Sequence, residues 1–340
     1  LLSYQAFIFY SSGTTGPPKG IRIPHRSILA HCVIGNDMYS MEKGERMPLP
    51  EENSTIHGVL PLFHAGGLIT LFVMMSRGMT VVLNQKFRLT RFVQTLMEKK
   101  VSCVYLVPSA LTALSTLPRE IQLPHLKLIY IGSAPLSSRD ADRFMERFPG
   151  CTLVQMYGLT EAGVLIFATL EGGDPTKVGV AMSGVQFKIL NENGDECDFN
   201  EPGAIIVKTA TMANGYLHRM RFDEWFDTGD VGSVDANGVL SIVERTKEMI
   251  KVRGWQVNPY ELESAISNDV DGVEECAIVG VPFNGEILPH AFIVGKPNTD
   301  EVLQFVKDNF VSYKHLRAVS IVEELPKTAT GKVIKAALVQ

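Results

Sequence analysis

A loop near the start of the chain has the residue types of a phosphate-binding site. Residues 10–20 read YSSGTTGPPKG and follow a short apolar run. Glycines allow backbone N–H groups to approach phosphate oxygens, the hydroxyl groups add donors, and Lys19 adds a positive charge. The spacing is not that of a Walker A loop, because G-x-x-x-x-G-K-[ST] does not align with it. On composition alone, an ordinary surface turn is an equally good interpretation.

Five further motifs follow this loop along the chain. They are GSAPL at 132–136, QMYGLTEAG at 155–163, WFDTGDVG at 225–232, ERTKEMIKVRG at 244–254 and LPKTATGK at 325–332. With the loop, they resemble in identity and order the motifs of the adenylate-forming superfamily. That superfamily contains acyl-CoA synthetases, aryl-CoA ligases such as 4-coumarate–CoA ligase, firefly luciferase and nonribosomal peptide adenylation domains. The resemblance implies activation of a carboxylic acid by ATP to an acyl adenylate, followed by thioester formation with CoA.

The resemblance assigns ATP contacts to residues of several motifs. The residues that it implies are Ser11, Ser12, Gly13, Thr14, Thr15, Gly16, Lys19, Gly132, Ser133, Ala134, Pro135, Tyr157, Gly158, Asp230 and Arg245. The segment from Gly132 would lie along the adenine and Tyr157 would stack on it. Asp230 would accept hydrogen bonds from the ribose hydroxyls, and Arg245 would contact ribose or phosphate. Without the resemblance, Tyr157 is equally compatible with a core tyrosine, and Asp230 is typical of a turn.

The same resemblance implies the catalytic residues. Thr160 would supply a hydroxyl group for phosphate, and Glu161 would supply a carboxylate for Mg²⁺, which binds few protein oxygens and bridges ATP oxygens. Lys332 matches the lysine that reaches the acid and the α-phosphate in the adenylation step, and Lys251 matches the lysine of the second step. The implied cofactors are ATP and Mg²⁺, with CoA as co-substrate. Taken singly, both lysines are typical of a solvated surface.

His64 matches the family position beside the entrance for the carboxylate and the thiol. A lone histidine in an apolar run is otherwise typical of a satisfied core residue. We expect the acyl pocket to be bounded by residues 61–67, 130–134 and 158–165, which are mostly small or apolar. Such a lining favours an apolar tail or an aromatic ring without naming the acid.

The hydrophobic pattern predicts an α/β fold. In the first half, short apolar runs alternate with longer amphipathic segments, which indicates a large domain with a mainly parallel sheet. The strands are expected at 7–10, 80–83, 101–107, 128–131 and 152–156, and the helices from 26 on and at 89–99, 109–117 and 137–148. After Gly163, short runs separated by turns predict a β-rich subdomain.

The end of the chain predicts a small mobile α+β C-terminal domain. Asn258 and the Pro-Tyr-Glu that follows it predict a helix start, and a second helix is expected at 299–309. Strands are expected at 276–281, 291–294 and 319–322. We predict a large AMP-binding core at 1–246, truncated at its N-terminus, and a small domain at 247–340. Lys247 occupies the family's hinge position, which implies that the small domain rotates between the half-reactions.

Composition limits the partners. The chain has 340 residues, with 32 basic and 37 acidic side chains and a net charge of −5, which argues against coating nucleic acid. Its longest uncharged apolar stretches, 66–76 and 163–170, are shorter than the roughly 18 residues of a membrane span. The five cysteines form no C-x-x-C pair, so neither a disulfide framework nor a zinc site is expected. The expected partners are a small-molecule carboxylic acid, ATP and CoA, and the oligomeric state is not readable.

Localisation and competence are further expectations. The N-terminus does not resemble a secretory signal, and the C-terminus lacks a Ser-Lys-Leu address, so a cytoplasmic rather than peroxisomal location is expected. The family normally carries a sizeable region before the phosphate loop, residues 217–224 look shorter than usual, and Glu244 stands where aspartate is usual. A truncated, weakly active or inactive nucleotide-binding remnant is therefore the alternative. Within the family, a carrier-protein-loading or luciferase-like enzyme also stays open.

Overall fold

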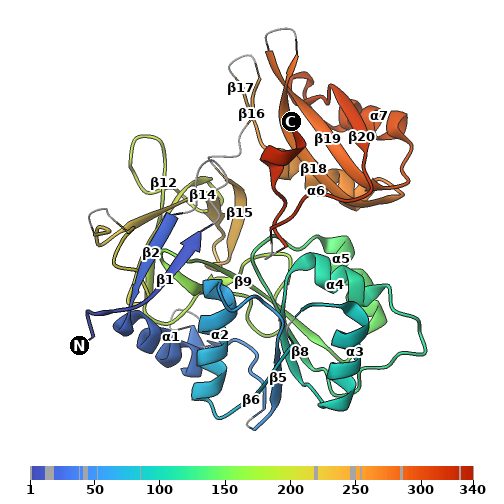
Figure 1. Cartoon of the computed structure of the whole chain (residues 1–340). Coiled ribbons are helices and arrows are strands. Elements are labelled where there is room, and N and C mark those ends of the chain that lie inside the picture. The colour runs from blue at the N-terminus through green and yellow to red at the C-terminus, as the bar shows by residue number, and fades with distance from the viewer. Residues whose placement is uncertain are drawn as a thin grey trace. The chain divides into compact units, whose positions relative to one another are not determined.

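The computed structural model divides the chain into two compact units (Figure 1). It describes residues 2–11, 19–37, 39–40, 45–51, 53–84, 86–217, 221–245, 250–252, 255–283, 286–328 and 331–339. The first unit holds most of the chain up to Ser241, and the second holds Gly229–Gly232 and the chain from Ile242 onward. The predicted domain boundary at 246/247 and the hinge residue Lys247 lie outside the described residues.

A seven-stranded sheet forms the centre of the first unit, in the order β11-β10-β9-β8-β7-β5-β6. The strands β5, β6, β7, β8 and β9 pair in parallel, and β10 and β11 add antiparallel pairs at one edge. Their bounds are Thr55–Gly58 (β5), Thr80–Leu83 (β6), Cys103–Leu106 (β7), Leu128–Ile131 (β8), Thr152–Leu159 (β9), Gly163–Ala168 (β10) and Val180–Ala181 (β11). The predicted mainly parallel α/β fold is therefore confirmed.

Helices cover both faces of this sheet (Figure 1). Val104 of β7 packs in one core with helices α3 (Leu89–Glu98), α4 (Pro108–Ser115) and α5 (Ser138–Arg147). Its neighbour Tyr105 packs in the opposite core. Successive side chains of a strand point to opposite faces, so an entirely apolar strand such as β7 fills both cores.

Helices α1 (His25–Asp37) and α2 (Ala65–Ser76) lie on the face that Tyr105 contacts. The whole apolar stretch 66–76 therefore lies in helix α2, and most of its side chains are buried. No helix in the part of the chain that the structure describes is long and apolar enough to cross a membrane.

The first predicted strand is present, but the prediction that it belongs to the parallel sheet is wrong. The run at 7–10 lies in β1 (Gln5–Ser11), which pairs antiparallel with β2 (Lys19–Pro24) in a separate two-stranded sheet. Only seven residues connect the two strands, whereas a parallel crossover needs a dozen or more. Antiparallel pairing is the arrangement that so short a connection allows.

The predicted β-rich subdomain is a four-stranded sheet in the order β12-β13-β14-β15. Its strands are Val185–Leu190 (β12), Gly203–Thr209 (β13), Phe226–Val234 (β14) and Leu240–Arg245 (β15). Two turns of this region contain Gly194 at φ 87° and Gly238 at φ 72°, which is the left-handed conformation that glycine adopts without steric cost. Two short strands, Tyr39–Ser40 (β3) and Glu45–Arg46 (β4), pair separately.

The second unit has the predicted α+β composition. A three-stranded sheet, β18-β19-β20, packs with α6 and α7 around one apolar core. Asn258 and Asn298 cap the two helices by accepting hydrogen bonds from the backbone N–H groups of Tyr260 and Asp300. The elements are Ile250–Val252 (β16), Trp255–Val257 (β17), Pro259–Asp269 (α6), Val273–Phe283 (β18), Glu286–Gly295 (β19), Thr299–Asn309 (α7), Ser312–Lys314 (η2), Ala318–Ile321 (β20) and Lys335–Leu338 (η3).

Candidate active site

Several predicted site residues meet at the carboxyl edge of the parallel sheet. This edge is where open α/β sheets bind ligands. The loops that leave β5 and β8, together with the end of β9, line a cavity of about 60 Å³. The predicted residues in its lining are His64, Gly132, Ser133, Gly158 and Thr160.

The three segments expected to bound the acyl pocket all contribute to this cavity. Segment 61–67 supplies His64 and Gly66. Residues of segments 130–134 and 158–165 line the cavity beside them. Sequence reasoning missed further lining residues of β7, α2, β9 and the loop after β5. They are Leu60, Thr70, Tyr105, Leu106 and Met156.

Two stacked tyrosines form part of the cavity wall. The rings of Tyr105 and Tyr130 lie 4.7 Å apart, and the Tyr130 hydroxyl donates to the Pro48 carbonyl at 2.8 Å. Burial raises the pKa of both phenols well above their usual value, so both are neutral at pH 7. This part of the wall therefore presents rings rather than charge to an acid.

The turn between β9 and β10 carries Thr160 and Glu161. The Glu161 carbonyl accepts from the Ala213 N–H at 2.9 Å, and the Glu161 Oε1 accepts from the Tyr216 hydroxyl at 3.2 Å. The Lys19 ammonium lies 5.3 Å from the centroid of the same tyrosine ring. Tyr216 therefore links the lysine of the phosphate loop to the carboxylate expected to bind Mg²⁺. No sequence signal marked Tyr216, because it lies 55 residues from Glu161.

A buried histidine supports the same turn. His31 of α1 is 3% exposed, and its ring contacts the Ser27 carbonyl at 2.7 Å and the Val164 N–H at 3.0 Å. A carbonyl only accepts and an N–H only donates, so Nδ1 carries the proton and Nε2 is bare. Burial lowers the pKa of His31 to about 4, which keeps the ring neutral. His31 therefore fixes the start of β10 relative to α1.

His64 caps α2 from the cavity side. Its Nδ1 accepts from the Gly66 N–H at 3.2 Å, and burial lowers its pKa from the usual 6.5. Because Nδ1 accepts from an N–H, the neutral ring carries its proton on Nε2, which can donate to an acid group in the cavity. The backbone of Ser133 adopts φ 70°, a left-handed conformation that costs energy for a residue other than glycine. Such outliers cluster at binding sites, and this one lines the cavity.

Other predicted residues lie outside the cavity lining. Tyr157 is half-buried and packs against Phe167 at 6.1 Å. Ala134 accepts a hydrogen bond from the Gln155 side chain at 3.2 Å, and the next residue, Pro135, is exposed. Asp230 of β14 is 3% exposed.

The phosphate loop and two basic residues are only partly described. Ser11 ends β1 and pairs with Lys19 in the strand register. Arg245 and Lys251 are placed by their backbone in β15 and β16. Ser12, Gly13, Thr14, Thr15 and Gly16 lie outside the described residues.

The donor chemistry of the β9–β10 turn fits Mg²⁺. Within the described ranges, no three histidine, cysteine, aspartate or glutamate side chains are grouped to hold a metal ion. Magnesium needs no such cage, since it commonly takes one or two carboxylates and completes its shell with waters and substrate phosphates. The half-buried Glu161 carboxylate, next to the Thr160 hydroxyl, supplies that kind of ligand.

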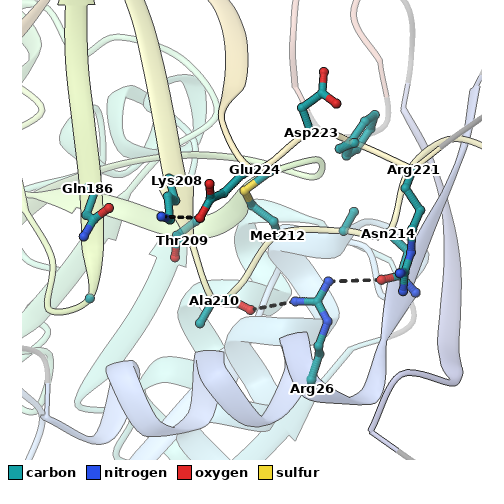
Figure 2. A pocket seen from close by; sticks show the side chains of 13 residues that line it. Arg26, Gln186, Lys208, Thr209, Ala210, Met212, Asn214, Arg221, Asp223 and Glu224 are labelled. Atoms are coloured by element: carbon teal, nitrogen blue, oxygen red, sulfur yellow. Dashed lines mark hydrogen bonds and ion pairs between the residues drawn. The ribbon is translucent and has the colours of Figure 1, made fainter.

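A larger cavity in the first unit contains none of the predicted site residues. It has about 520 Å³, and Figure 2 shows the side chains around it. Arg26 donates to the Ala210 carbonyl at 3.4 Å and to the Asn214 side chain at 3.0 Å, while Lys208 pairs with Glu224. None of the residues that the motifs predict for ATP or the acid lines this cavity, so cavity size alone does not identify the active site.

Comparisons with known proteins agree with the motifs. The AMP-binding enzyme family model matches residues 4–217, and the model of the AMP-binding enzyme C-terminal domain matches residues 261–332. The chain is 30% identical to 4-coumarate–CoA ligase-like 4 of Oryza sativa subsp. japonica, over 98% of this chain and 62% of that protein. It is 32% identical to 4-coumarate–CoA ligase 1 of the same organism, over 96% of this chain and 61% of that protein. The chain thus spans about 62% of the length of the curated relatives that it matches.

Solved structures show the same fold. ATP-bound MatB from Rhodopseudomonas palustris matches with a TM-score of 0.87 and 26% identity, over 99% of this chain and 68% of that one. O-succinylbenzoate CoA synthetase (MenE) from Bacillus subtilis, in complex with ATP and magnesium ion, matches with a TM-score of 0.82 and 26% identity, over 99% and 70%. With both family models matched in order, the chain belongs to the AMP-binding enzymes of the adenylate-forming superfamily.

Proposed function

We propose that this chain is an ATP-dependent acid–thiol ligase that makes an acyl adenylate and then an acyl-CoA. The observation that carries the proposal is the cavity at the carboxyl edge of the sheet. It combines His64, Ser133 and Thr160 within the walls expected for an acyl pocket, and Thr160 adjoins Glu161 in the same turn.

In the first step, a carboxylate oxygen attacks the α-phosphorus of ATP. The bond from that phosphorus to the bridging oxygen breaks, and pyrophosphate leaves. Both reactants are anionic, so the protein must offset negative charge. Lys19 and the backbone of the phosphate loop hold phosphate oxygens, the Thr160 hydroxyl donates to another, and Lys332 brings its ammonium group to the acid and the α-phosphate. Bound Mg²⁺, held by Glu161, would neutralise phosphate charge.

In the second step, the CoA sulfur attacks the carbonyl carbon of the adenylate. The bond to the AMP oxygen breaks, AMP leaves, and the thiol proton passes to solvent. His64 lies at the cavity with a neutral ring, and its Nε2–H is suited to donate a hydrogen bond to the carbonyl oxygen as negative charge develops on it. Lys251 would serve this step after a rotation of the small domain about Lys247, so that one cavity is used by two lysines in turn.

The lining and the volume of the cavity also favour one class of acid substrate. Apart from His64 and three hydroxyl side chains, its wall is made of tyrosine rings, aliphatic and methionine side chains and glycine. Its volume of about 60 Å³ is small beside the ~300–1,000 Å³ of drug-sized ligand pockets. An acid with a compact aromatic ring or a short apolar tail fits such a wall. The carboxylate end would lie towards His64 and Thr160.

A second candidate is a nucleotide-binding remnant with little or no ligase activity. The chain spans about 62% of the length of the curated relatives that it matches, so the comparison does not carry their complete activity over to it. The remnant would bind ATP without releasing pyrophosphate in an acid-dependent way.

One experiment separates the two candidates. The 340-residue chain would be incubated with Mg-ATP, CoA and a panel of aryl and fatty acids, and pyrophosphate release and acyl-CoA would be followed together, with Lys332→Ala as control. We expect acid-dependent pyrophosphate and acyl-CoA that are lost in the control. ATP binding without any adenylate from a folded chain would favour the remnant. Pyrophosphate release without acyl-CoA would indicate another acceptor, such as a carrier protein, or a luciferase-like reaction.

A further inference from the structure

Lys332 lies in a short hydrogen-bonded turn of the second unit. The Thr328 N–H donates to the Lys332 carbonyl at 2.8 Å, and the Lys332 N–H donates to the Thr328 hydroxyl oxygen at 3.2 Å. Lys327 and Val333 form an antiparallel bridge at the base of the turn. These contacts shape the turn.

Two ion pairs join the chain on either side of Lys332 to the rest of the second unit. The Lys327 ammonium lies 2.6 Å from a carboxylate oxygen of Glu275 on β18. The Lys335 ammonium lies 2.7 Å from a carboxylate oxygen of Glu263 on α6. The four side chains are only 16–34% exposed, so solvent and salt screen these pairs less than they screen pairs on the open surface.

Glu263 has a second role in the packing. The same carboxylate oxygen accepts from the Ile278 N–H of β18 at 2.7 Å. It therefore joins α6, β18 and the segment that follows Lys332 through one half-buried group. Burial, with the negative charge of Glu263 beside it, raises the pKa of the neighbouring Cys276 thiol well above its usual value. The Glu263 side chain is 16% exposed and the Glu275 side chain 34%, and replacing Glu263 leaves a backbone N–H with a weaker partner.

We infer that Glu263 and Glu275 are positioning residues that hold the Lys332 turn for the adenylation step. The inference rests on the proposed role of Lys332 in that step. Both glutamates act through lysines that flank the turn. A displacement of about 1 Å in a reacting group can cost about 100-fold in rate, so a turn released on one side would slow adenylation.

The test compares the two half-reactions in Glu275→Gln and Glu263→Gln variants of the full chain. Adenylation is measured as acid-dependent exchange of pyrophosphate into ATP, and thioester formation is measured from preformed acyl adenylate and CoA. We expect the exchange kcat to fall about tenfold in Glu275→Gln and further in Glu263→Gln, with little change in the KM for ATP. Thioester formation should keep its wild-type rate, because Lys251 rather than Lys332 serves it.

Two further variants control for lost charge and for folding. Glu196→Gln removes the same charge from a glutamate that pairs with Lys188 at 3.0 Å in the first unit, and it should leave both half-reactions unchanged. The exchanged pair Lys327→Glu with Glu275→Lys restores opposite charges and should recover most of the adenylation rate. Equal losses in both half-reactions, or no recovery in the exchanged pair, would overturn the inference.

A readout without activity separates this inference from the proposed function. Hydrogen exchange at the Gly331 and Lys332 amides reports on the turn whether or not the chain forms an adenylate. We expect faster exchange at both amides in the two glutamine variants and not in Glu196→Gln. If wild type forms no adenylate with any acid, the proposed function fails, and unchanged exchange at these amides would independently reject the attachment by Glu263 and Glu275.

Discussion

The two turns that carry the proposed chemistry are held by different physics. The β9–β10 turn, with Thr160 and Glu161, is fixed by hydrogen bonds with uncharged groups, since His31 accepts from the Val164 N–H and Tyr216 donates to Glu161. The Lys332 turn is fixed to its unit by ion pairs of half-buried side chains. Neutral hydrogen bonds to buried groups are barely screened by salt but fail when the buried group must take up a proton. Ion pairs between partly exposed side chains are weakened by salt, so salt should act on the Lys332 turn and not on the β9–β10 turn.

Acid is expected to have the largest effect, and to act on the first unit. His31 and His57 are 2–3% exposed, and burial lowers the pKa of each to about 4. Each histidine binds a proton near pH 6.5 when unfolded and near pH 4 when folded, so the unfolded state holds more protons between these values. The free energy of unfolding should be highest above pH 6.5 and fall by about 3 kcal/mol per histidine on acidification to pH 4.

Denaturant unfolding at several pH values measures this slope. The Asn84 side chain lies 3.0 Å from His57 Nε2, and no partner is found for the buried Nδ1 among the described residues, so this ring gains nothing that would favour its charged form. Unfolding should be followed with probes in the first unit. A free energy of unfolding that stays constant from pH 7 to pH 4.5 would contradict the pKa shifts.

Removing the His31 ring is the next largest expected change. His31→Ala leaves the Val164 N–H and the Ser27 carbonyl without their partner and creates a cavity under β10. We expect the free energy of unfolding to fall by about 2–4 kcal/mol, from lost hydrogen bonds and lost packing together. His25→Ala, on the exposed start of α1, is the matched control and should change stability by less than about 0.5 kcal/mol. The variant should also lose part of the acid sensitivity of wild type.

A methyl group at Gly158 tests how closely β9 and β10 approach. A Cβ there would lie 2.5 Å from the Gly163 carbonyl oxygen and 2.5 Å from the Val164 carbonyl carbon, both backbone atoms. Gly158→Ala should therefore displace the turn and cost about 1–3 kcal/mol. Gly150→Ala adds a methyl group with nothing within 4 Å and serves as the control in the same denaturation experiment. Equal stability of the two variants would show that the strands separate without cost.

Local patterns in the sequence predicted where the helices and strands of the first unit lie better than which elements they contact. The amphipathic run at 89–99 became α3 (Leu89–Glu98), because one face is buried and the other is exposed. Helix α2 was not predicted, since its sequence, AGGLITLFVMMS, has no polar face and so no readable period. The site residues came from motif order, which a single loop could not have supplied. His31 and Tyr216 were missed because their partners Val164 and Glu161 lie 133 and 55 residues away in the sequence, and no motif spacing covers such separations.

Salt should give the smallest effect and should act on the Lys332 turn rather than on the β9–β10 turn. Raising the ionic strength from about 0.1 M to 1 M shortens the screening length from ~10 Å to ~3 Å, which weakens the Lys327–Glu275 pair more than the less exposed Lys335–Glu263 pair. We expect exchange of the Gly331 and Lys332 amides to quicken about two- to threefold, consistent with less than about 1 kcal/mol per pair. The Val164 amide, held by neutral His31, should keep its rate in the same samples. If exchange at the Val164 amide quickens as much as exchange at Gly331 and Lys332, salt loosens the whole chain. The two turns then do not differ in the interactions that hold them.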